Sequence, residues 1–235
     1  MIELQGVTRT YDTPTGVVEA LRGIDLRITR GEMVAVTGAS GAGTSSLLNI
    51  LGFLDVPTNG RYVLEGTDIG KLSRRQLART RADQVGVVSP MFDLLPDLSV
   101  LENLELPLLY AHVEVRRRRA RQALERVGLT DHQNDRPADL LAAQRHQVLI
   151  ARALINNPVL LLRDKPSYEL DTESTAVAMG LLTELNNAGH TVVFCTAGKD
   201  QTAAHAHRIL VLRAGQIVSD QPNTRIPAPA AEPVE

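Results

Sequence analysis

The stretch Gly38-Ala39-Ser40-Gly41-Ala42-Gly43-Thr44-Ser45-Ser46 decides the fold of this chain. It follows the apolar run 33–37 and leads into the apolar segment 46–51, so a strand, a glycine-rich loop and a helix succeed one another. Glycines allow backbone N–H groups to converge on phosphate oxygens at a helix N-terminus, where the helix dipole also favours an anion. The stretch therefore predicts a phosphate-binding loop, with a glycine-rich turn that holds no ligand as the alternative.

One position of the loop departs from the pattern G-x-x-x-x-G-K-[ST]. A lysine is expected after the last glycine, and Thr44 stands there, so the ammonium that reaches the outer phosphates is missing. The neighbouring glycines and hydroxyls are retained. The residues that we expect to contact a phosphate-bearing ligand are Gly38, Ser40, Gly41, Gly43, Thr44, Ser45 and Ser46.

Composition indicates an ordinary globular protein. The 235 residues are 43% hydrophobic and 22% charged, which fits one large or two small domains. A net charge of −2 gives no indication of a nucleic-acid or anionic-membrane partner, and the basic run 116–119 reads as a solvated helix face. The single cysteine, Cys195, lies in an apolar run and excludes an internal disulfide. Because no window approaches the ~18 apolar residues of a membrane span, we expect a soluble, cytoplasmic chain.

The first half of the chain begins with strands and continues with helices. Strand-like runs occupy 2–7, 17–21, 24–28, 33–37 and about 61–64. Helical patterns follow at 74–82 after a Ser73 cap, at 100–110 after a Ser99 cap, and at about 113–127. A helical insert therefore interrupts the sheet.

Strands and helices alternate again in the second half. The pattern predicts a helix over 140–154, a buried strand over 159–162, a helix from Asp171 or Thr172 to Gly189, a buried strand over 191–195 and a closing hairpin of 207–212 with 216–219. The tail from 222 to 235 contains Pro, Ala and Glu with almost no large apolar residue, so we expect it to be disordered. The six histidines, including His205 and His207, lack a convincing set of carboxylate or cysteine neighbours and indicate no metal site.

Aligned in this order, residues 2–219 resemble an ATP-binding cassette (ABC) transporter ATPase. The stretches 46–52, 92–96, 102–110 and 150–154 (SLLNILG, FDLLP, ENLELPLLY and IARAL) look like the lipoprotein-release and macrolide-export branch. The resemblance implies an α/β fold, a P-loop NTPase cassette with an N-terminal antiparallel β subdomain and a helical insert at about 91–155. It implies one nucleotide-binding domain over 1–220, with 221–235 as the disordered tail.

The resemblance also implies ATP and Mg²⁺ as cofactors. Tyr11 matches the aromatic residue that stacks on adenine, with a solvent-facing loop tyrosine as the alternative. Ser45 and Asp164 match the hydroxyl and the carboxylate that hold magnesium, and such oxygens suit a hard cation. A turn residue after a strand is the alternative reading of Asp164.

The residues that make the family an enzyme are replaced. The loop lysine is Thr44, the sensor glutamine is Pro90, the L-S-G-G-Q signature reads Leu140-Leu141-Ala142-Ala143-Gln144, the catalytic glutamate is Lys165 and the switch histidine is Ala197. Loss of a positioned proton acceptor costs ~10²- to 10⁴-fold in rate, and loss of one charge-stabilising donor ~10²- to 10³-fold. The sequence therefore offers no catalytic residue and predicts weak or no ATP hydrolysis.

Lys165 changes the charge of the predicted pocket. Relative to the family pattern, Thr44 removes one positive charge and Lys165 adds two, because it replaces a glutamate. We therefore expect Lys165 to substitute in part for the missing ammonium and to bind nucleotide weakly. An ion pair of Lys165 with Asp164 or Glu169 in an empty site is the alternative.

The resemblance implies protein partners as well. Two cassettes of the family pair head to tail and enclose ATP between the loop of one and the signature of the other, so we expect a homodimer or heterodimer. An integral-membrane permease would hold the chain at the inner face of the cell membrane. The predicted function is a pseudo-ATPase subunit with a structural or nucleotide-sensing role. The alternatives are an active ATPase that energises export or lipoprotein release, and the product of a decaying gene.

Overall fold

The computed structural model describes residues 1–14, 16–89, 92–109, 116–164, 172–196, 203–223 and 226. The strands form a four-stranded sheet with the order β2-β1-β4-β5 and a six-stranded sheet with the order β10-β9-β3-β8-β7-β6. The first sheet contains β1 (Ile2–Thr13), β2 (Gly16–Ile28), β4 (Asn59–Leu64) and β5 (Thr67–Asp68). The second contains β3 (Met33–Thr37), β6 (Val85–Val88), β7 (Leu160–Arg163), β8 (Thr191–Thr196), β9 (Arg208–Arg213) and β10 (Gln216–Pro222).

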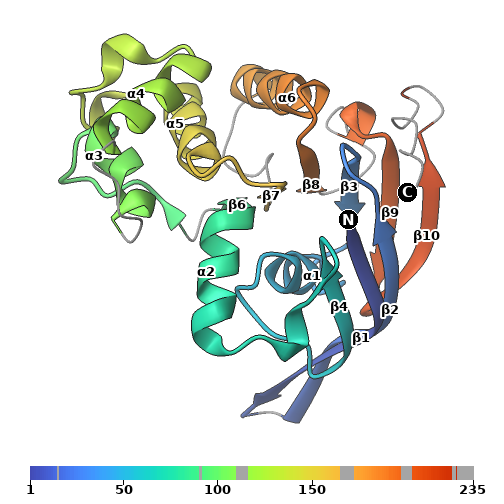
Figure 1. Cartoon of the computed structure of the whole chain (residues 1–235). Helices are drawn as coiled ribbons and strands as arrows, with labels where there is room; N and C mark the ends of the chain where they lie inside the picture. The colour runs from blue at the N-terminus through green and yellow to red at the C-terminus, as the bar shows by residue number, and fades with distance from the viewer. Residues whose placement is uncertain are drawn as a thin grey trace.

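The helices group on the two faces of the six-stranded sheet. They are α1 (Thr44–Leu51), α2 (Arg74–Gln84), α3 (Val100–Glu105), α4 (Arg116–Arg126), α5 (Ala142–Leu154) and α6 (Thr172–Asn187). Figure 1 shows α3, α4 and α5 gathered at one side of the molecule, away from the four-stranded sheet. The predicted α/β fold, with an antiparallel β region and a helical insert, is confirmed.

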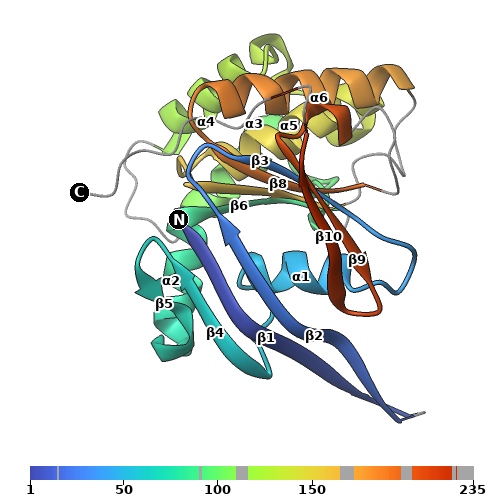
Figure 2. The ribbon, with the colours of Figure 1, turned by 90° about the vertical axis from the view of Figure 1, so that its right-hand side faces the viewer.

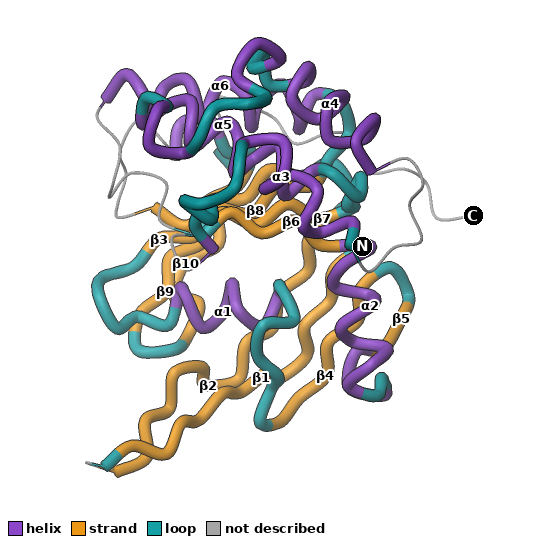
Figure 3. The backbone as a smooth tube through the Cα atoms, turned by 90° about the vertical axis from the view of Figure 1, so that its left-hand side faces the viewer, coloured by secondary structure: helices purple, strands orange, loops and turns teal. Residues whose placement is uncertain are grey.

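The six-stranded sheet is the centre of a layered molecule. Strands β6, β7, β8, β3 and β9 run parallel, and β10 closes the sheet antiparallel to β9. All residues of β3, β7 and β8 are buried, as expected for parallel strands covered on both faces. Helix α1 lies between the two sheets, and α3 to α6 cover the opposite face (Figures 2 and 3).

The apolar core consists of two clusters, and β3 contributes side chains to both. Met33 and Ala35 pack into the cluster that α3 to α6 contribute to, whereas Val34 and Val36 pack into the cluster around α1 and the four-stranded sheet. The alternation follows from the period of two along a strand. The carboxyl end of β3 therefore leads directly into the loop that begins α1.

The first two strands are longer than the pattern predicts. The runs 17–21 and 24–28 belong to one strand, β2, and the prediction of two separate strands is wrong. Positive φ angles at Gly6 (55°) and Gly23 (75°) accompany register shifts between β1 and β2, so the hydrophobic alternation changes phase while the pairing continues. The resulting long hairpin projects beyond α1 (Figure 2).

The predicted helix caps agree with the structure. Ser73 and Ser99 form capping boxes with Gln76 and Glu102 at the starts of α2 and α3. Helix α3 ends at Glu105 instead of continuing to residue 110, and Pro107 lies in the 3-10 turn Leu106–Leu108 that follows. Further 3-10 turns are η1 (Ile69–Lys71), η4 (Thr130–His132), η5 (Pro137–Asp139) and η6 (Ala203–His205).

The expected disordered tail over 221–235 is wrong at its first two residues, because Gln221 and Pro222 pair with β9 as the end of β10. Beyond Asn223, and apart from Ile226, the tail lies outside the described residues. Residues 113–115 of the predicted charged helix and the predicted cap at 171 also fall outside them. Among the helices that the structure describes, none has the length and apolar character needed to cross a bilayer.

Candidate functional site

A pocket of about 430 Å³ lies where the loop after β3 faces the hairpin of β1 and β2. All seven loop residues predicted to contact a phosphate line it, together with Tyr11. The structure therefore brings these predicted residues together. The full lining is Tyr11, Val18, Glu19, Ala20, Gly38, Ala39, Ser40, Gly41, Gly43, Thr44, Ser45, Ser46, Cys195 and Thr196.

Packing explains why the loop keeps its glycines. Gly43 has a φ of 103°, and a Cβ atom there would lie 2.4 Å from the carbonyl oxygen of Ala20. At Gly38 a Cβ atom would lie 2.8 Å from the carbonyl oxygen of Leu212. Both approaches are shorter than real contacts allow, so the fold itself requires glycine at these positions.

The start of α1 is a suitable cradle for an anion. Gly43 is the N-cap, it carries no side-chain cap, and the first turn contains no acidic residue. The first backbone N–H groups of a helix have no intrahelical acceptor, and they point toward the helix end. The cradle therefore fits a phosphate group, which backbone donors and the helix dipole would bind.

The lining of the pocket, as far as the structure describes it, carries no positively charged side chain. Among the lining residues that the structure describes, Glu19 is the one with a formal charge, and it pairs with Arg22 at 3.3 Å between Oε2 and Nε. Thr44 places a methyl group and a hydroxyl where a lysine is expected. Lys165, which the sequence predicts as the replacement cation, lies outside the described residues, as do Pro90 and Ala197.

An apolar wall faces the phosphate loop across the pocket. Tyr11 and Val18 are cross-strand partners in β1 and β2, and both line the pocket. An aromatic ring beside an aliphatic side chain suits a planar base. Arg9 and Asp55, which the sequence analysis did not single out, hold Tyr11 through its ring face and its hydroxyl.

The two predicted magnesium ligands do not line the same pocket. Ser45 lines it, whereas Asp164 follows β7, which β8 separates from β3 in the sheet. The backbone N–H of Asp164 donates to the carbonyl oxygen of Val88 at 3.0 Å, which fixes the turn after β7. Within the described residues, no group of three or more His, Cys, Asp and Glu side chains is arranged to hold a metal ion.

A buried arginine precedes Asp164. Arg163 is fully buried at the end of β7, its Nη2 lies 2.8 Å from Nε2 of His146 on α5, and its Nη1 lies 3.9 Å from Sδ of Met179 on α6. Burial lowers the pKa of Arg163 to about 9. Burial and the charge of Arg163 lower the pKa of His146 to about 3, so this imidazole is neutral near pH 7. No pattern in the sequence indicated this contact.

The signature segment is an ordinary helix start. Leu141 is the N-cap of α5, is 71% exposed and makes no side-chain cap. Oε1 of Gln144 accepts from the backbone N–H of Leu141 at 2.9 Å, and its Nε2 lies 3.0 Å from Nε2 of His132. Gln144, the one polar residue of the signature that is retained, is therefore engaged within its own helix and with His132.

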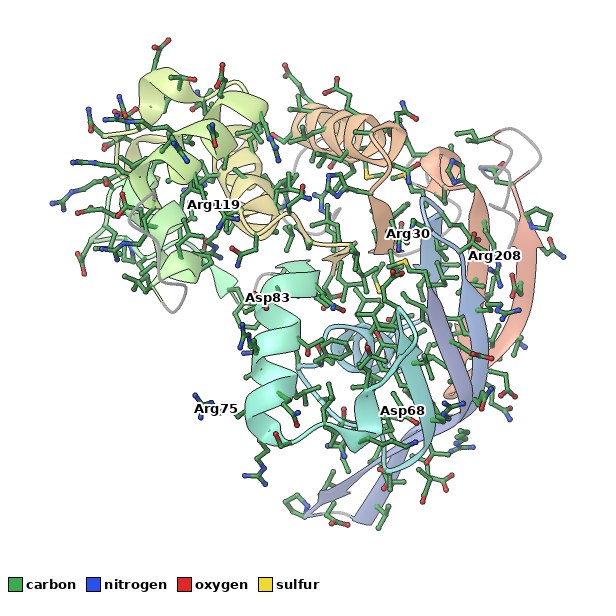
Figure 4. The ribbon with its side chains drawn as sticks, in the orientation of Figure 1. Arg30, Asp68, Arg75, Asp83, Arg119 and Arg208 are labelled. Atoms are coloured by element: carbon green, nitrogen blue, oxygen red, sulfur yellow. The ribbon has the colours of Figure 1, made fainter. Side chains whose placement is uncertain are left out.

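An apolar groove of about 660 Å³ lies between α2 and the helical segment. Phe92 and Leu95, which are 40% and 48% exposed, line it. Ile155 also lines the groove, and its carbonyl oxygen accepts a hydrogen bond from Arg119 at 2.8 Å. Figure 4 shows Arg75 pointing away from α2. Exposed apolar side chains gathered in a groove are typical of a protein-docking surface.

Comparison with known proteins places these features in a family. A family model described as "ABC transporter" matches residues 21–168. A probable syringafactin export ATP-binding/permease protein, SyfD of Pseudomonas syringae pv. syringae (strain B728a), is 43% identical over 229 residues, 97% of this chain and 35% of that protein. The macrolide export ATP-binding/permease protein MacB of Escherichia coli is 44% identical over 222 residues, 94% of this chain and 34% of that protein. The chain thus spans about a third of the length of these relatives.

Solved structures agree. The ATP-binding cassette MJ0796, in a dimeric post-hydrolysis state bound to ADP and Pi, superimposes with a TM-score of 0.84 at 37% identity, over 94% of this chain and 98% of that one. A second dimeric structure of the same cassette gives a TM-score of 0.85 at the same identity and coverage.

Proposed function

The chain belongs to the ABC transporter family as an ATP-binding domain, and from this premise we propose that it is a nucleotide-binding subunit that hydrolyses ATP weakly or not at all. The observation that carries the proposal is the pocket itself. Its backbone cradle at Gly43 is complete, whereas the loop cation is replaced by Thr44. ATP binding depends largely on the backbone donors of the cradle, whereas ATP hydrolysis depends on charged side chains such as the replaced loop lysine.

Hydrolysis requires groups that this sequence lacks. Lys165 stands where the family has a proton-accepting glutamate, and a charged ammonium cannot accept a proton. Ala197 replaces the switch histidine, and Pro90 replaces the glutamine that senses water and magnesium. Because such groups act as a unit, losing several of them leaves little of the rate enhancement.

A weak, static association with ATP is the expected behaviour. The backbone donors at the start of α1 bind the phosphates, and Tyr11 and Val18 bind the base. Lys165 would supply a positive charge in place of the loop lysine. Magnesium, where present, would bind the Ser45 hydroxyl directly and the Asp164 carboxylate, which does not line the pocket, through water.

The proposed partners follow from the groove and from the relatives. The apolar groove beside Phe92 and Leu95 would bind a cytoplasmic segment of an integral-membrane permease. A second cassette, identical or not, would complete a dimer, as in the dimeric structures of MJ0796. The chain would then lie at the inner face of the cell membrane and act as a structural or nucleotide-sensing subunit.

Calorimetric titration with ATP, with and without Mg²⁺, tests binding, and a phosphate-release assay tests turnover. We expect saturable binding and a hydrolysis rate at least ~10²-fold below that of an intact cassette such as the ATP-binding domain of MacB. Magnesium-dependent turnover comparable to that of MacB would establish an active transport ATPase instead. No binding at millimolar ATP would leave a scaffold that acts through protein contacts alone.

The Lys165→Ala variant tests the replacement charge. Loss of one ammonium near a phosphate should weaken ATP binding about tenfold, since a charge-assisted hydrogen bond contributes about 1.5–3 kcal/mol at most. Lys71→Ala is the matched control, because Lys71 is 80% exposed on η1 and does not line the pocket. Equal affinities for Lys165→Ala and Lys71→Ala would refute this role of Lys165.

A further inference from the structure

The side chains of Tyr11, Arg9 and Asp55 form a contact network at the base side of the pocket. Oδ2 of Asp55 accepts from the hydroxyl of Tyr11 at 2.8 Å and from Nε of Arg9 at 2.7 Å. Oδ1 of the same carboxylate accepts from the backbone N–H of Val56 at 2.8 Å. The Arg9 and Asp55 side chains are 22% and 19% exposed, so the ion pair is shielded from most of the solvent.

Arg9 also covers one face of the aromatic ring. Its guanidinium carbon lies 4.4 Å from the centroid of Tyr11, which is within the range of a cation–π contact. Tyr11 is therefore held twice, through its face by Arg9 and through its hydroxyl by Asp55. The rest of the ring contributes to the wall of the nucleotide pocket.

The network joins the base side of the pocket to the phosphate side. Asp55 lies just beyond the C-terminus of α1, where its backbone N–H and that of Leu54 donate to the carbonyl oxygen of Asn49 at 3.2 Å and 2.9 Å. The other end of α1 begins at Gly43 in the phosphate loop. One helix thus carries the phosphate cradle at its start, and the anchor of the aromatic ring follows its end.

We propose that Arg9 and Asp55 are positioning residues that hold Tyr11 as a fixed stacking platform for the base, at a set distance from the phosphate cradle. The inference rests on the proposed nucleotide binding and adds how the pocket selects its ligand. Because the loop lysine is absent, a larger share of the affinity comes from the base, and a ring that is already ordered loses less entropy when the base stacks on it.

The test compares ATP with inorganic tripolyphosphate, which has the phosphates and no base. Arg9→Met removes the cation and keeps an apolar stem, and we expect it to weaken ATP binding about three- to tenfold by calorimetry. Tripolyphosphate binding should not change. In a Tyr11→Ala background, Arg9→Met should have no further effect on ATP, because the platform that it positions is gone.

Arg61→Met is the matched control. Arg61 pairs with Asp68 on the same sheet at 2.9 Å between Nε and Oδ2, with no part in the pocket, so this variant removes an arginine–aspartate pair without changing ATP affinity. Asp55→Asn should resemble Arg9→Met, and Tyr11→Phe should lose less than Tyr11→Ala, because it keeps the ring. Thermal unfolding of each variant identifies any general loss of structure.

All variants are also measured in a Thr44→Lys background, which restores the loop ammonium and raises the affinity. Suppose that ATP binding is detected only in the Thr44→Lys background, with Arg9→Met weakening it only when Tyr11 is present. In that case the positioning role of Arg9 and Asp55 is supported, and the proposed nucleotide binding of the native chain fails. The positioning role would be overturned if Arg9→Met weakened the binding of ATP and of tripolyphosphate equally. It would also be overturned if Arg9→Met still weakened ATP binding in the Tyr11→Ala background. Absence of ATP binding in both backgrounds would overturn both proposals.

Discussion

The phosphate loop and the signature segment are both turns that lead into a helix, yet they have changed in opposite ways. The loop before α1 keeps glycine at 38, 41 and 43, whereas the start of α5 has Ala142 and Ala143 where the family has glycines. A Cβ atom at Gly43 would meet the backbone of Ala20, while both alanines lie in regular helix. The packing of the fold therefore requires Gly38 and Gly43, whereas the regular helix at 142 and 143 has no such requirement for glycine.

Because packing constrains some of these positions and not others, only the unconstrained positions carry information about ligand binding. Gly38 and Gly43 would persist in a chain that had stopped binding nucleotide, because the packing against Leu212 and Ala20 would still require them. Thr44 and the two alanines stand at positions that the fold leaves open. The residues at these positions are therefore the ones that agree with the proposed loss of phosphate contacts in the loop and in the signature.

The largest expected effect is that of Gly43→Ala. The contact with the Ala20 oxygen and the φ of 103° should together destabilise the protein by about 3 kcal/mol or more, measured by denaturant unfolding. Gly41→Ala is the control, because its φ is 78° with no atom within 4 Å of the new Cβ, so it should cost about 1 kcal/mol. Equal losses at the two positions would break the argument that packing requires Gly43.

The fold could be predicted from the sequence where local signals suffice. Ser73 and Ser99 begin helices through capping boxes, and the buried strand after Val159 and the hairpin turned at Ala214 lie where the apolar runs place them. The length of β2 could not be predicted, because the register shift near Gly23 depends on pairing with β1. Tertiary pairing there overrides the local pattern.

Acid should destabilise the signature side of the molecule, by about 2 kcal/mol at pH 5. The pKa of His146 is lowered in the folded state to about 3 from 6.5, so between these values the unfolded chain binds the proton and the folded chain does not. The stability that neutral His146 contributes is therefore present above pH 6.5 and is lost as the pH falls toward 3. Urea unfolding at pH 7 and pH 5 measures the difference.

His146→Gln is the matched variant for this titration. Glutamine can still accept a hydrogen bond from Arg163 and has no proton to gain, so its loss of stability from pH 7 to pH 5 should be smaller by about 2 kcal/mol. An unchanged pH dependence in His146→Gln would place the acid-sensitive group elsewhere.

Thr44→Lys sharpens the comparison at the loop. The restored ammonium should tighten ATP binding about tenfold, which is about 1.4 kcal/mol, without restoring hydrolysis, because Lys165 and Ala197 remain. Thr44→Gln adds length without charge and should leave the affinity close to that of the parent. Turnover in Thr44→Lys, measured by phosphate release, would mean that the loop lysine alone had been limiting.

The pocket was predictable to the extent that it is contiguous in sequence. Seven loop residues fall within 38–46, so their spacing alone brought them together. Tyr11 needed the family resemblance, and Arg9 and Asp55 needed the structure, because their contact joins positions 46 residues apart. Arg163 on β7 contacts His146 on α5, and no pattern in the sequence of either element predicts this contact.

The smallest expected effects come from restoring the signature. Leu141→Ser would add a side-chain cap to α5 and should stabilise the protein by about 0.5–1 kcal/mol, while Ala142→Gly and Ala143→Gly should each cost up to about 1 kcal/mol. Thermal unfolding of the three single variants and the triple variant measures these changes. Near-cancellation in the triple variant, with ATP binding of the monomer unchanged, would indicate that this segment lost its ligand contacts without any demand from the fold. A large destabilisation by either glycine would instead mean that the alanines are required for packing, and the contrast with the loop would fail.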